Sequence, residues 1–111
     1  MPYKNLITRY FDSFSKKDID TISELFADNI VLQDWNIYEV GKANVLKANS
    51  NIFDSIEEIK VVPITFYKNS DTSFAVQIEI QTNSDEKIRV IDVIEFNGDG
   101  KINKITAFMI D

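Results

Sequence analysis

Residues 74–102 read FAVQIEIQTNSDEKIRVIDVIEFNGDGKI, and apolar side chains alternate with polar ones through most of this stretch. A period of two is typical of β-strands, because successive side chains point to opposite faces of a sheet. The turn sequences NSD, NSD and NGDG, at residues 69–71, 83–85 and 97–100, divide the second half of the chain. The pattern therefore predicts an antiparallel meander of four strands, over residues 57–68, 73–82, 87–97 and 101–110.

The first half of the chain has the longer period of helices. Apolar side chains recur every three or four residues over residues 3–15, which predicts an amphipathic helix. DIDTISELFADN, residues 18–29, predicts a second helix that Asp18 or Asp20 caps, and a strand follows over residues 30–35. A third helix is predicted over residues 42–55. Helices followed by strands predict a single α+β domain over residues 1–111, in which three helices pack in the concave face of a strongly curved, mixed or antiparallel sheet.

Charge and composition exclude several classes of function. The 111 residues carry a net charge of −6 and no basic cluster longer than the pair Lys16 and Lys17, so neither nucleic acid nor a membrane is an expected partner. Cysteine and histidine are absent, which excludes thiolate and Ser-His-Asp catalysis and the commonest zinc sites. We therefore expect no metal and no cofactor. The N-terminal sequence MPYKNLITRY lacks the regions of a signal peptide, so the cytoplasm is the expected location.

Three polar side chains are predicted to point toward the interior. Asp92 stands in VIDVIEF, on the same strand face as Val90 and Ile94, where a carboxylate is costly unless it is paired, hydrogen-bonded or protonated. Asp34 takes a similar place on the strand over residues 30–35, although an aspartate there could simply cap a turn. Tyr10 lies on the apolar stripe of the first helix, where a tyrosine is commonly a packing residue whose hydroxyl reaches a carbonyl or water.

The order of these motifs resembles the ketosteroid isomerases and the wider SnoaL-like group, which share the cone-shaped nuclear transport factor 2-like (cystatin-like) fold. The resemblance covers nearly the whole chain and rests on TRYFDSF (residues 8–14), DIDTISELFADNIVLQDW (18–35) and VIDVIEFNGDGKINKITAF (90–108). It implies that Tyr10 donates to a substrate oxygen and that Asp34 moves the proton. It also implies that Asp92, a carboxylic acid kept neutral by its apolar site as in those isomerases, is the second donor.

A physical reading of the residues agrees with the resemblance. Two carboxyls in unlike surroundings have separated pKa values, which supplies an acid and a base without histidine. Protonated Asp92 and Tyr10 would stabilise an enolate oxygen, while Asp34 would remove a proton alpha to that carbonyl. The predicted pocket is completed by eight further residues, namely Phe14, Phe26, Trp35, Asn49, Phe53, Val90, Ile94 and Phe108.

Two functions remain open on this basis. The first is an isomerase or cyclase acting on a small, mostly apolar carbonyl compound. In the isomerases proline follows the base, whereas Trp35 follows Asp34 here, which favours a substrate other than a steroid. The second is a non-catalytic domain that binds a small molecule or serves as a dimeric structural unit, because a fold does not dictate its function.

The strand pattern also predicts an apolar outer face. If Asp92 points inward, then Ile91, Val93, Ile105, Ala107 and Met109 are expected on the outward side of the last two strands. A monomer seldom exposes such a patch. The sequence therefore predicts a homodimer that forms through the outer sheet face.

Overall fold

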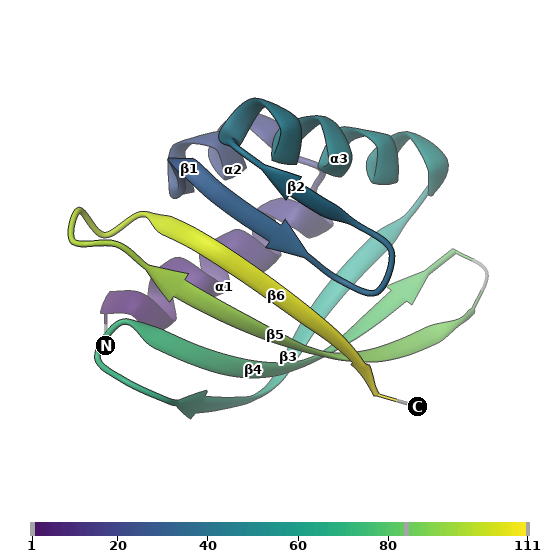
Figure 1. The fold of residues 1–111 in the computed structure, drawn as a ribbon. Helices are drawn as coiled ribbons and strands as arrows, with labels where there is room; N and C mark the ends of the chain where they lie inside the picture. Colours follow the sequence, from purple (N-terminus) through teal and green to yellow (C-terminus); the bar gives the residue numbers. More distant parts are fainter. Residues whose placement is uncertain (1, 84, 111) are drawn as a thin grey trace.

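The computed structural model describes residues 2–83 and 85–110, which form three helices and six strands (Figure 1). In chain order the elements are α1 (Pro2–Ser15), α2 (Ile19–Leu25), β1 (Phe26–Gln33), β2 (Tyr38–Val40), α3 (Lys42–Ser55), β3 (Ile59–Lys68), β4 (Ser73–Thr82), β5 (Lys87–Phe96) and β6 (Ile102–Ile110). The predicted α+β fold class is confirmed. Within the described residues, no helix is long and apolar enough to cross a membrane.

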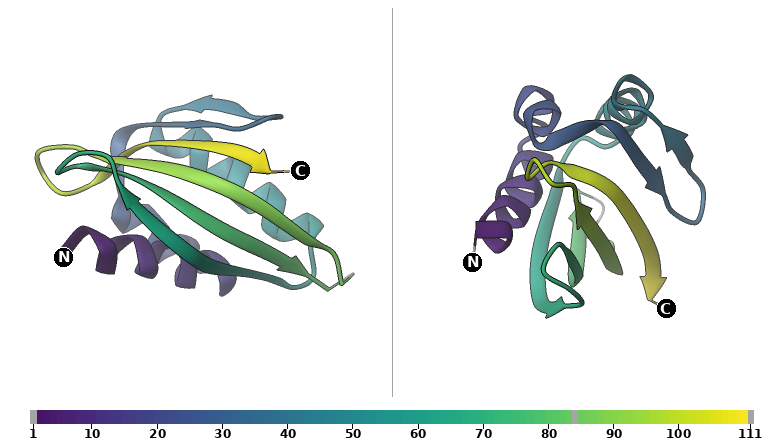
Figure 2. Two further views of the ribbon diagram at one scale, coloured as in Figure 1. Left: turned by 90° about the horizontal axis from the view of Figure 1, so that it is seen from below. Right: turned by 60° about the vertical axis from the view of Figure 1, so that its left-hand side comes forward.

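The strands form one mixed sheet in the order β2-β1-β6-β5-β4-β3. The meander is as predicted, because β3, β4, β5 and β6 pair with their neighbours in antiparallel fashion. β1 lies parallel to β6, and the short β2 adds to its other side. The sheet is therefore open, with β2 and β3 at its edges. Figure 2 shows its strands twisted and bent, with α1 along the sheet and α2 and α3 near β1 and β2.

The second helix ends earlier than the sequence predicts. Asp18 caps its start as expected, because its carboxylate accepts hydrogen bonds from Thr21 N at 3.2 Å and Thr21 Oγ1 at 2.7 Å. The helix stops at Leu25, and residues 26–29 begin β1 instead. Phe26 pairs with Ile102 of β6, and the two residues are 1% and 0% exposed. Burial in this distant pairing, which no local pattern reveals, outweighs the helical tendency of the segment.

One lysine fixes the end of α3 to the region just after α1. Lys17 Nζ donates to the carbonyl oxygens of Phe53 at 2.8 Å and Glu57 at 3.0 Å, and also to that of Ile56. The last carbonyls of a helix have no partners within the helix and carry partial negative charge, so an ammonium group is favourable there. This contact helps to hold α3 in place above the sheet.

A β-bulge in β6 decides which of its side chains face the core. Phe96 pairs with Ile102, but Glu95 pairs with Lys104, so Asn103 is an extra residue in β6. Because successive side chains alternate between faces, a shift of one residue reverses the facing of every later side chain in the strand.

The predicted outward facing of Ile105, Ala107 and Met109 is therefore wrong. Ile105 is 1% exposed, and Ala107 pairs with the buried Asp92 on the inner face. Met109 pairs with Val90 on the same side. The error has a clear cause, since the expectation assumed a regular hairpin without the extra residue.

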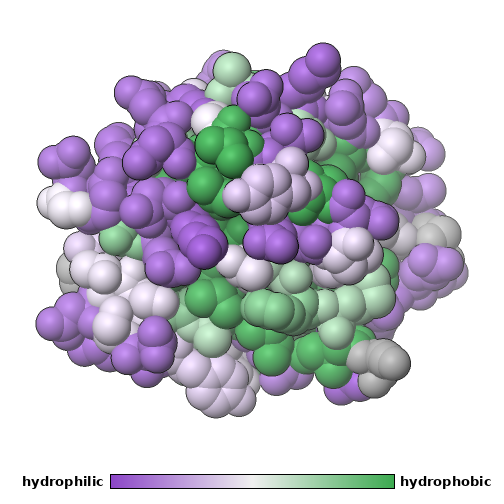
Figure 3. All heavy atoms as spheres, in the orientation of Figure 1, coloured by the Kyte–Doolittle hydropathy of each residue, from purple (hydrophilic) through white to green (hydrophobic). Residues whose placement is uncertain are grey.

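The outer face over β5 and β6 nevertheless carries an apolar patch. Ile91 and Val93 do face outward, and their partners there are Phe108 and Thr106. Phe108 is 55% exposed, and Figure 3 shows apolar side chains gathered over this part of the sheet. Monomers seldom leave such a patch uncovered. We propose that this outer sheet face joins two copies of the chain in a homodimer.

The variant Phe108→Glu is expected to convert the dimer into a monomer, because the interface would have to bury an unpaired carboxylate on each side. Sedimentation equilibrium at several protein concentrations measures the change in mass. The control is Ile64→Glu, at a side chain that is 54% exposed on the edge strand β3, and it should leave the dimer intact. A wild-type mass that stays monomeric at every concentration would contradict the proposal.

Candidate active site

A cavity of about 210 Å³ lies between α1, α3 and the inner face of the sheet. Its walls are mainly aromatic and aliphatic, and its polar lining includes Tyr10 of α1, Asp34 at the end of β1, Asn49 of α3 and Asp92 of β5. The structure thus brings the three predicted chemical residues to one hollow from three different elements.

Asp92 is a buried carboxyl in the middle of the sheet. It lies opposite Val76 of β4 and Ala107 of β6, and it is 8% exposed. Within residues 2–83 and 85–110, no hydrogen bond or ion pair reaches its carboxyl group. Burial raises the pKa of Asp92 to about 7, and the negative charge of Asp34 contributes to the increase. The group is therefore partly protonated near neutral pH and can donate a hydrogen bond.

Tyr10 both packs in the core and lines the cavity. Its ring centroid lies 5.5 Å from that of Phe11 and 5.8 Å from that of Phe26, and the residue is 5% exposed. Burial raises the pKa of the Tyr10 phenol, and the negative charge of Asp92 raises it further. The phenol therefore stays neutral at physiological pH and remains a hydrogen-bond donor.

Each of these two pKa shifts also depends on a neighbouring carboxylate. The charge of Asp34 acts on Asp92, and the charge of Asp92 acts on Tyr10. Such effects are strongest between groups that lie close together in a region of low dielectric. Asp92 therefore interacts electrostatically with both Asp34 and Tyr10, and all three side chains line the same cavity.

Asp34 is half-buried and also holds a turn. Its Oδ1 accepts hydrogen bonds from the backbone N–H groups of Asn36 and Ile37, both at 2.7 Å, just before β2 begins. The turn-capping role that the sequence left open is therefore real. It engages Oδ1 only, which leaves Oδ2 as the acceptor that can face a ligand in the cavity.

The other predicted pocket residues fall into two groups. The cavity is lined by Phe14, Trp35, Asn49 and Val90. The remaining four are not among its lining residues: Phe26, Phe53 and Ile94 lie in the hydrophobic core, and Phe108 lies on the outer sheet face. Ile94 lies on the same strand face as Asp92, two residues further along β5. Two residues along a strand span ~7 Å, which places Ile94 beyond the cavity. Phe108 faces outward because the bulge at Asn103 reverses the facing of the later side chains in β6.

Part of the cavity wall is formed by residues that were not among the predicted pocket residues. Ile78 and Ile80 of β4 and Ile88 of β5 all line the cavity. Ile78 pairs with Val90, and Ile80 pairs with Ile88, so all of them share the inner face with Asp92. The alternation in residues 74–81 carries this signal, because it places Ile78 and Ile80 on the same face of the strand.

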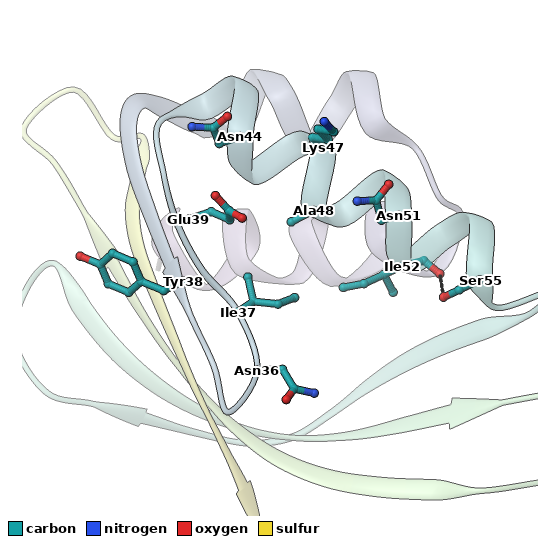
Figure 4. A pocket seen from close by; sticks show the side chains of 10 residues that line it. All are labelled: Asn36, Ile37, Tyr38, Glu39, Asn44, Lys47, Ala48, Asn51, Ile52 and Ser55. Carbon is teal, nitrogen blue, oxygen red and sulfur yellow. Dashed lines mark hydrogen bonds between the residues drawn. The ribbon is translucent and has the colours of Figure 1, made fainter.

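A second hollow of about 650 Å³ is an open groove between β2 and α3 (Figure 4). Its lining is largely polar and includes Asn36, Asn51 and Lys47, all of which are exposed. Asn44 Nδ2 donates to Val40 O at 3.0 Å, which fastens the helix to the edge strand. The groove therefore lacks the buried carboxyl and apolar walls that make the cavity suited to proton transfer.

Comparisons with known proteins agree with this fold. A family model described as a SnoaL-like domain matches residues 7–105, and among curated proteins none matches the chain. A candidate polyketide cyclase from Sinorhizobium meliloti is 19% identical and has a TM-score of 0.83, with 93% of each chain covered.

Two further solved structures are similar. A candidate ketosteroid isomerase from Kribbella flavida is 18% identical with a TM-score of 0.84, covering 98% of this chain and 78% of that one. The epoxide hydrolase/cyclase-like enzyme SalBIII, of pyran ring formation in the polyether salinomycin, is 19% identical with a TM-score of 0.83, covering 98% and 91%. At such identities the likeness shows the fold alone.

Proposed function

Because the chain belongs to the SnoaL-like domain family, and because Tyr10, Asp34 and Asp92 line one apolar cavity, we propose that it is an isomerase or cyclase. The reaction is a proton transfer alpha to a carbonyl in a small, mostly apolar compound. The observation that carries the proposal is the buried Asp92, whose carboxyl has a pKa of about 7 and lies within the electrostatic influence of Asp34.

Each group has a defined task in this reaction. The substrate carbonyl oxygen accepts hydrogen bonds from the Tyr10 hydroxyl and from protonated Asp92. Asp34 takes a proton from the carbon next to the carbonyl, and the negative charge moves onto the oxygen as the enolate forms. Asp34 then returns the proton to that carbon or to another carbon of the same conjugated system. Preorganised donors in a dry site stabilise the charge as it develops.

The same pair of carboxyls would also serve a cyclisation. Asp34 would take the proton of an attacking hydroxyl group while Asp92 donates its proton to the oxygen that leaves carbon. Both the Sinorhizobium meliloti protein and SalBIII carry cyclase in their names, which supports keeping this reaction beside isomerisation. The volume of about 210 Å³ supports a small substrate, because pockets for drug-sized ligands are typically ~300–1,000 Å³.

Proton exchange on a simple ketone tests the proposal without knowledge of the natural substrate. The wild-type protein in D₂O should speed up the loss of the alpha protons of 1-indanone, as followed by ¹H NMR. Tyr10→Phe should slow this exchange by about 100-fold, because it removes one of the two donors to the enolate oxygen. Phe11→Leu, which changes a neighbouring cavity side chain without a polar group, is the control and should retain most of the activity. An exchange rate equal to that of buffer would refute the proposal.

Non-catalytic binding in the same cavity is the second candidate function. It is favoured by the turn that Asp34 Oδ1 holds, since a structural role already explains that residue. A ¹³C NMR titration of Asp92 separates the two functions. A carboxyl that titrates at about 4, the value of an ordinary aspartate, would favour simple binding. One that keeps its proton near neutral pH would favour catalysis.

A further inference from the structure

The cavity holds a fourth polar side chain that the proposed reaction does not use. Asn49 lies in the middle of α3, is 2% exposed and lines the cavity. Its neighbours on the same face of the helix, Val45, Ile52 and Phe53, are apolar. Among the residues that the structure describes, no group accepts a hydrogen bond from Asn49 Nδ2.

An unpartnered amide in this place is costly for the fold. A buried polar group that lacks a hydrogen bond destabilises the protein, and a leucine of similar size would avoid that loss. Sites that bind ligands commonly keep such strained or unsatisfied groups at the expense of stability. Asn49 lines the same cavity as Tyr10 and Asp92, so a ligand bound there is the natural partner of its amide.

The carbonyl of the substrate cannot be that partner. A carbonyl oxygen has two lone pairs, and in the proposed reaction Tyr10 and Asp92 already donate to both. A third donor in the same cavity therefore needs a second acceptor. A hydroxyl group suits an amide best, because it can accept from Nδ2 and donate to Oδ1.

We propose that Asn49 binds a second oxygen of the substrate, and that the natural substrate is a compact, largely apolar compound with both a carbonyl and a separate hydroxyl or carbonyl group. This inference rests on the proposed function, because Tyr10 and Asp92 are taken to hold the first oxygen. Asn49 is then a specificity-determining residue. An engineered apolar cavity of ~150 Å³ binds benzene, so about 210 Å³ suits a substituted ring or a small fused pair of rings.

A matched set of probes tests the inference. The set consists of 1-indanone and three of its hydroxy derivatives, which are isomers of one another with the hydroxyl group at position 4, 5 or 6. The affinity of each compound is measured by NMR titration of the ¹⁵N-labelled protein. At least one hydroxy isomer should bind wild type about 10-fold more tightly than 1-indanone, because only that isomer satisfies the Asn49 amide. In Asn49→Leu the ratio of the affinity for that isomer to the affinity for 1-indanone should fall to about 1. The affinity for 1-indanone itself should be kept or increased.

The control is Ile52→Val, at an apolar cavity residue one turn further along α3. It should change the affinities for 1-indanone and for its hydroxy isomers in the same proportion. A second readout is the side-chain amide resonance of Asn49 in wild type, which should shift with the preferred isomer and stay in place with 1-indanone. It reports on the contact even if Asn49→Leu does not fold.

Three outcomes would overturn the inference. They are the absence of any hydroxy isomer that binds more tightly than 1-indanone, a preference that survives in Asn49→Leu, and a side-chain amide resonance of Asn49 in wild type that stays in place when the preferred isomer binds. Failure of the proposed reaction is separate: if wild type prefers a hydroxy isomer through Asn49 but exchanges no alpha protons, the reaction is wrong and the binding contact stands.

Discussion

Replacing Asp34 with asparagine is expected to lower kcat for the exchange of the alpha protons of 1-indanone by about 10²- to 10⁴-fold, which is the usual contribution of a general base. An amide cannot take the proton. The fold should be unchanged, because the side-chain oxygen of asparagine can still accept from the backbone N–H groups of Asn36 and Ile37. The substitution therefore removes the base and keeps the turn.

The matched control for Asp34→Asn is Asp28→Asn on the same strand. Asp28 is fully exposed to solvent, and its carboxylate forms a surface ion pair with Lys42 Nζ at 3.6 Å. Because it lies outside the cavity, Asp28→Asn should leave the exchange rate unchanged. Asp34→Asn also removes a negative charge that raises the pKa of Asp92, so a ¹³C titration should show that pKa moving down while burial keeps it above the ordinary value. Undiminished exchange in Asp34→Asn would exclude Asp34 as the base.

Asp92 should make the stability of the protein fall as the pH rises. Its pKa is about 7 in the folded protein, whereas an ordinary aspartate in an unfolded chain has a pKa of 3.8. Between these values the folded state holds more protons than the unfolded state, so the free energy of unfolding decreases with increasing pH. The stability that the proton on Asp92 contributes is fully present below pH ~4 and is lost above pH ~7. This difference in the pKa of Asp92 corresponds to a change in the free energy of unfolding of at most about 4 kcal/mol.

Asp92→Asn tests this dependence, because the amide has the same shape and carries no charge at any pH. The variant should be about as stable as wild type near pH 4 and more stable at pH 8, by up to roughly 4 kcal/mol. Urea denaturation at the two pH values measures the difference. Asp54→Asn, at an exposed position on α3, is the control and should show a constant difference from wild type. If the difference in the free energy of unfolding between Asp92→Asn and wild type is the same at both pH values, burial does not raise the pKa of Asp92.

Much of the architecture could be predicted because it follows from local patterns. The alternation over residues 74–96 is enough to define β4 and β5 and to place Asp92 among inward apolar side chains. The third helix was predicted with the bounds that the structure shows, Lys42–Ser55, because a glycine precedes its apolar stripe. In these segments the periodicity that forms the element also determines the buried face.

Other features could not be predicted because they depend on pairing between distant segments. The segment after Leu25 becomes a strand only because β6 lies beside it, 70 residues or more along the chain. The extra residue Asn103 likewise has no mark in the sequence, yet it turns Ala107 into the cavity and Phe108 out to solvent. A local pattern carries no information about which strand will be the neighbour.

The sequence by itself determined the α+β class, the strand meander and the inward direction of Asp92, since each depends on side chains a few residues apart. Only the tertiary structure decided that Tyr10, Asp34 and Asp92 line one cavity of about 210 Å³. It also decided that Asn49 joins them there with its Nδ2 unpartnered among the described residues. The reason is physical: the pKa of Asp92 and the unmet hydrogen bond of Asn49 arise from the removal of water, which happens only when α1, α3 and the sheet close around the same space.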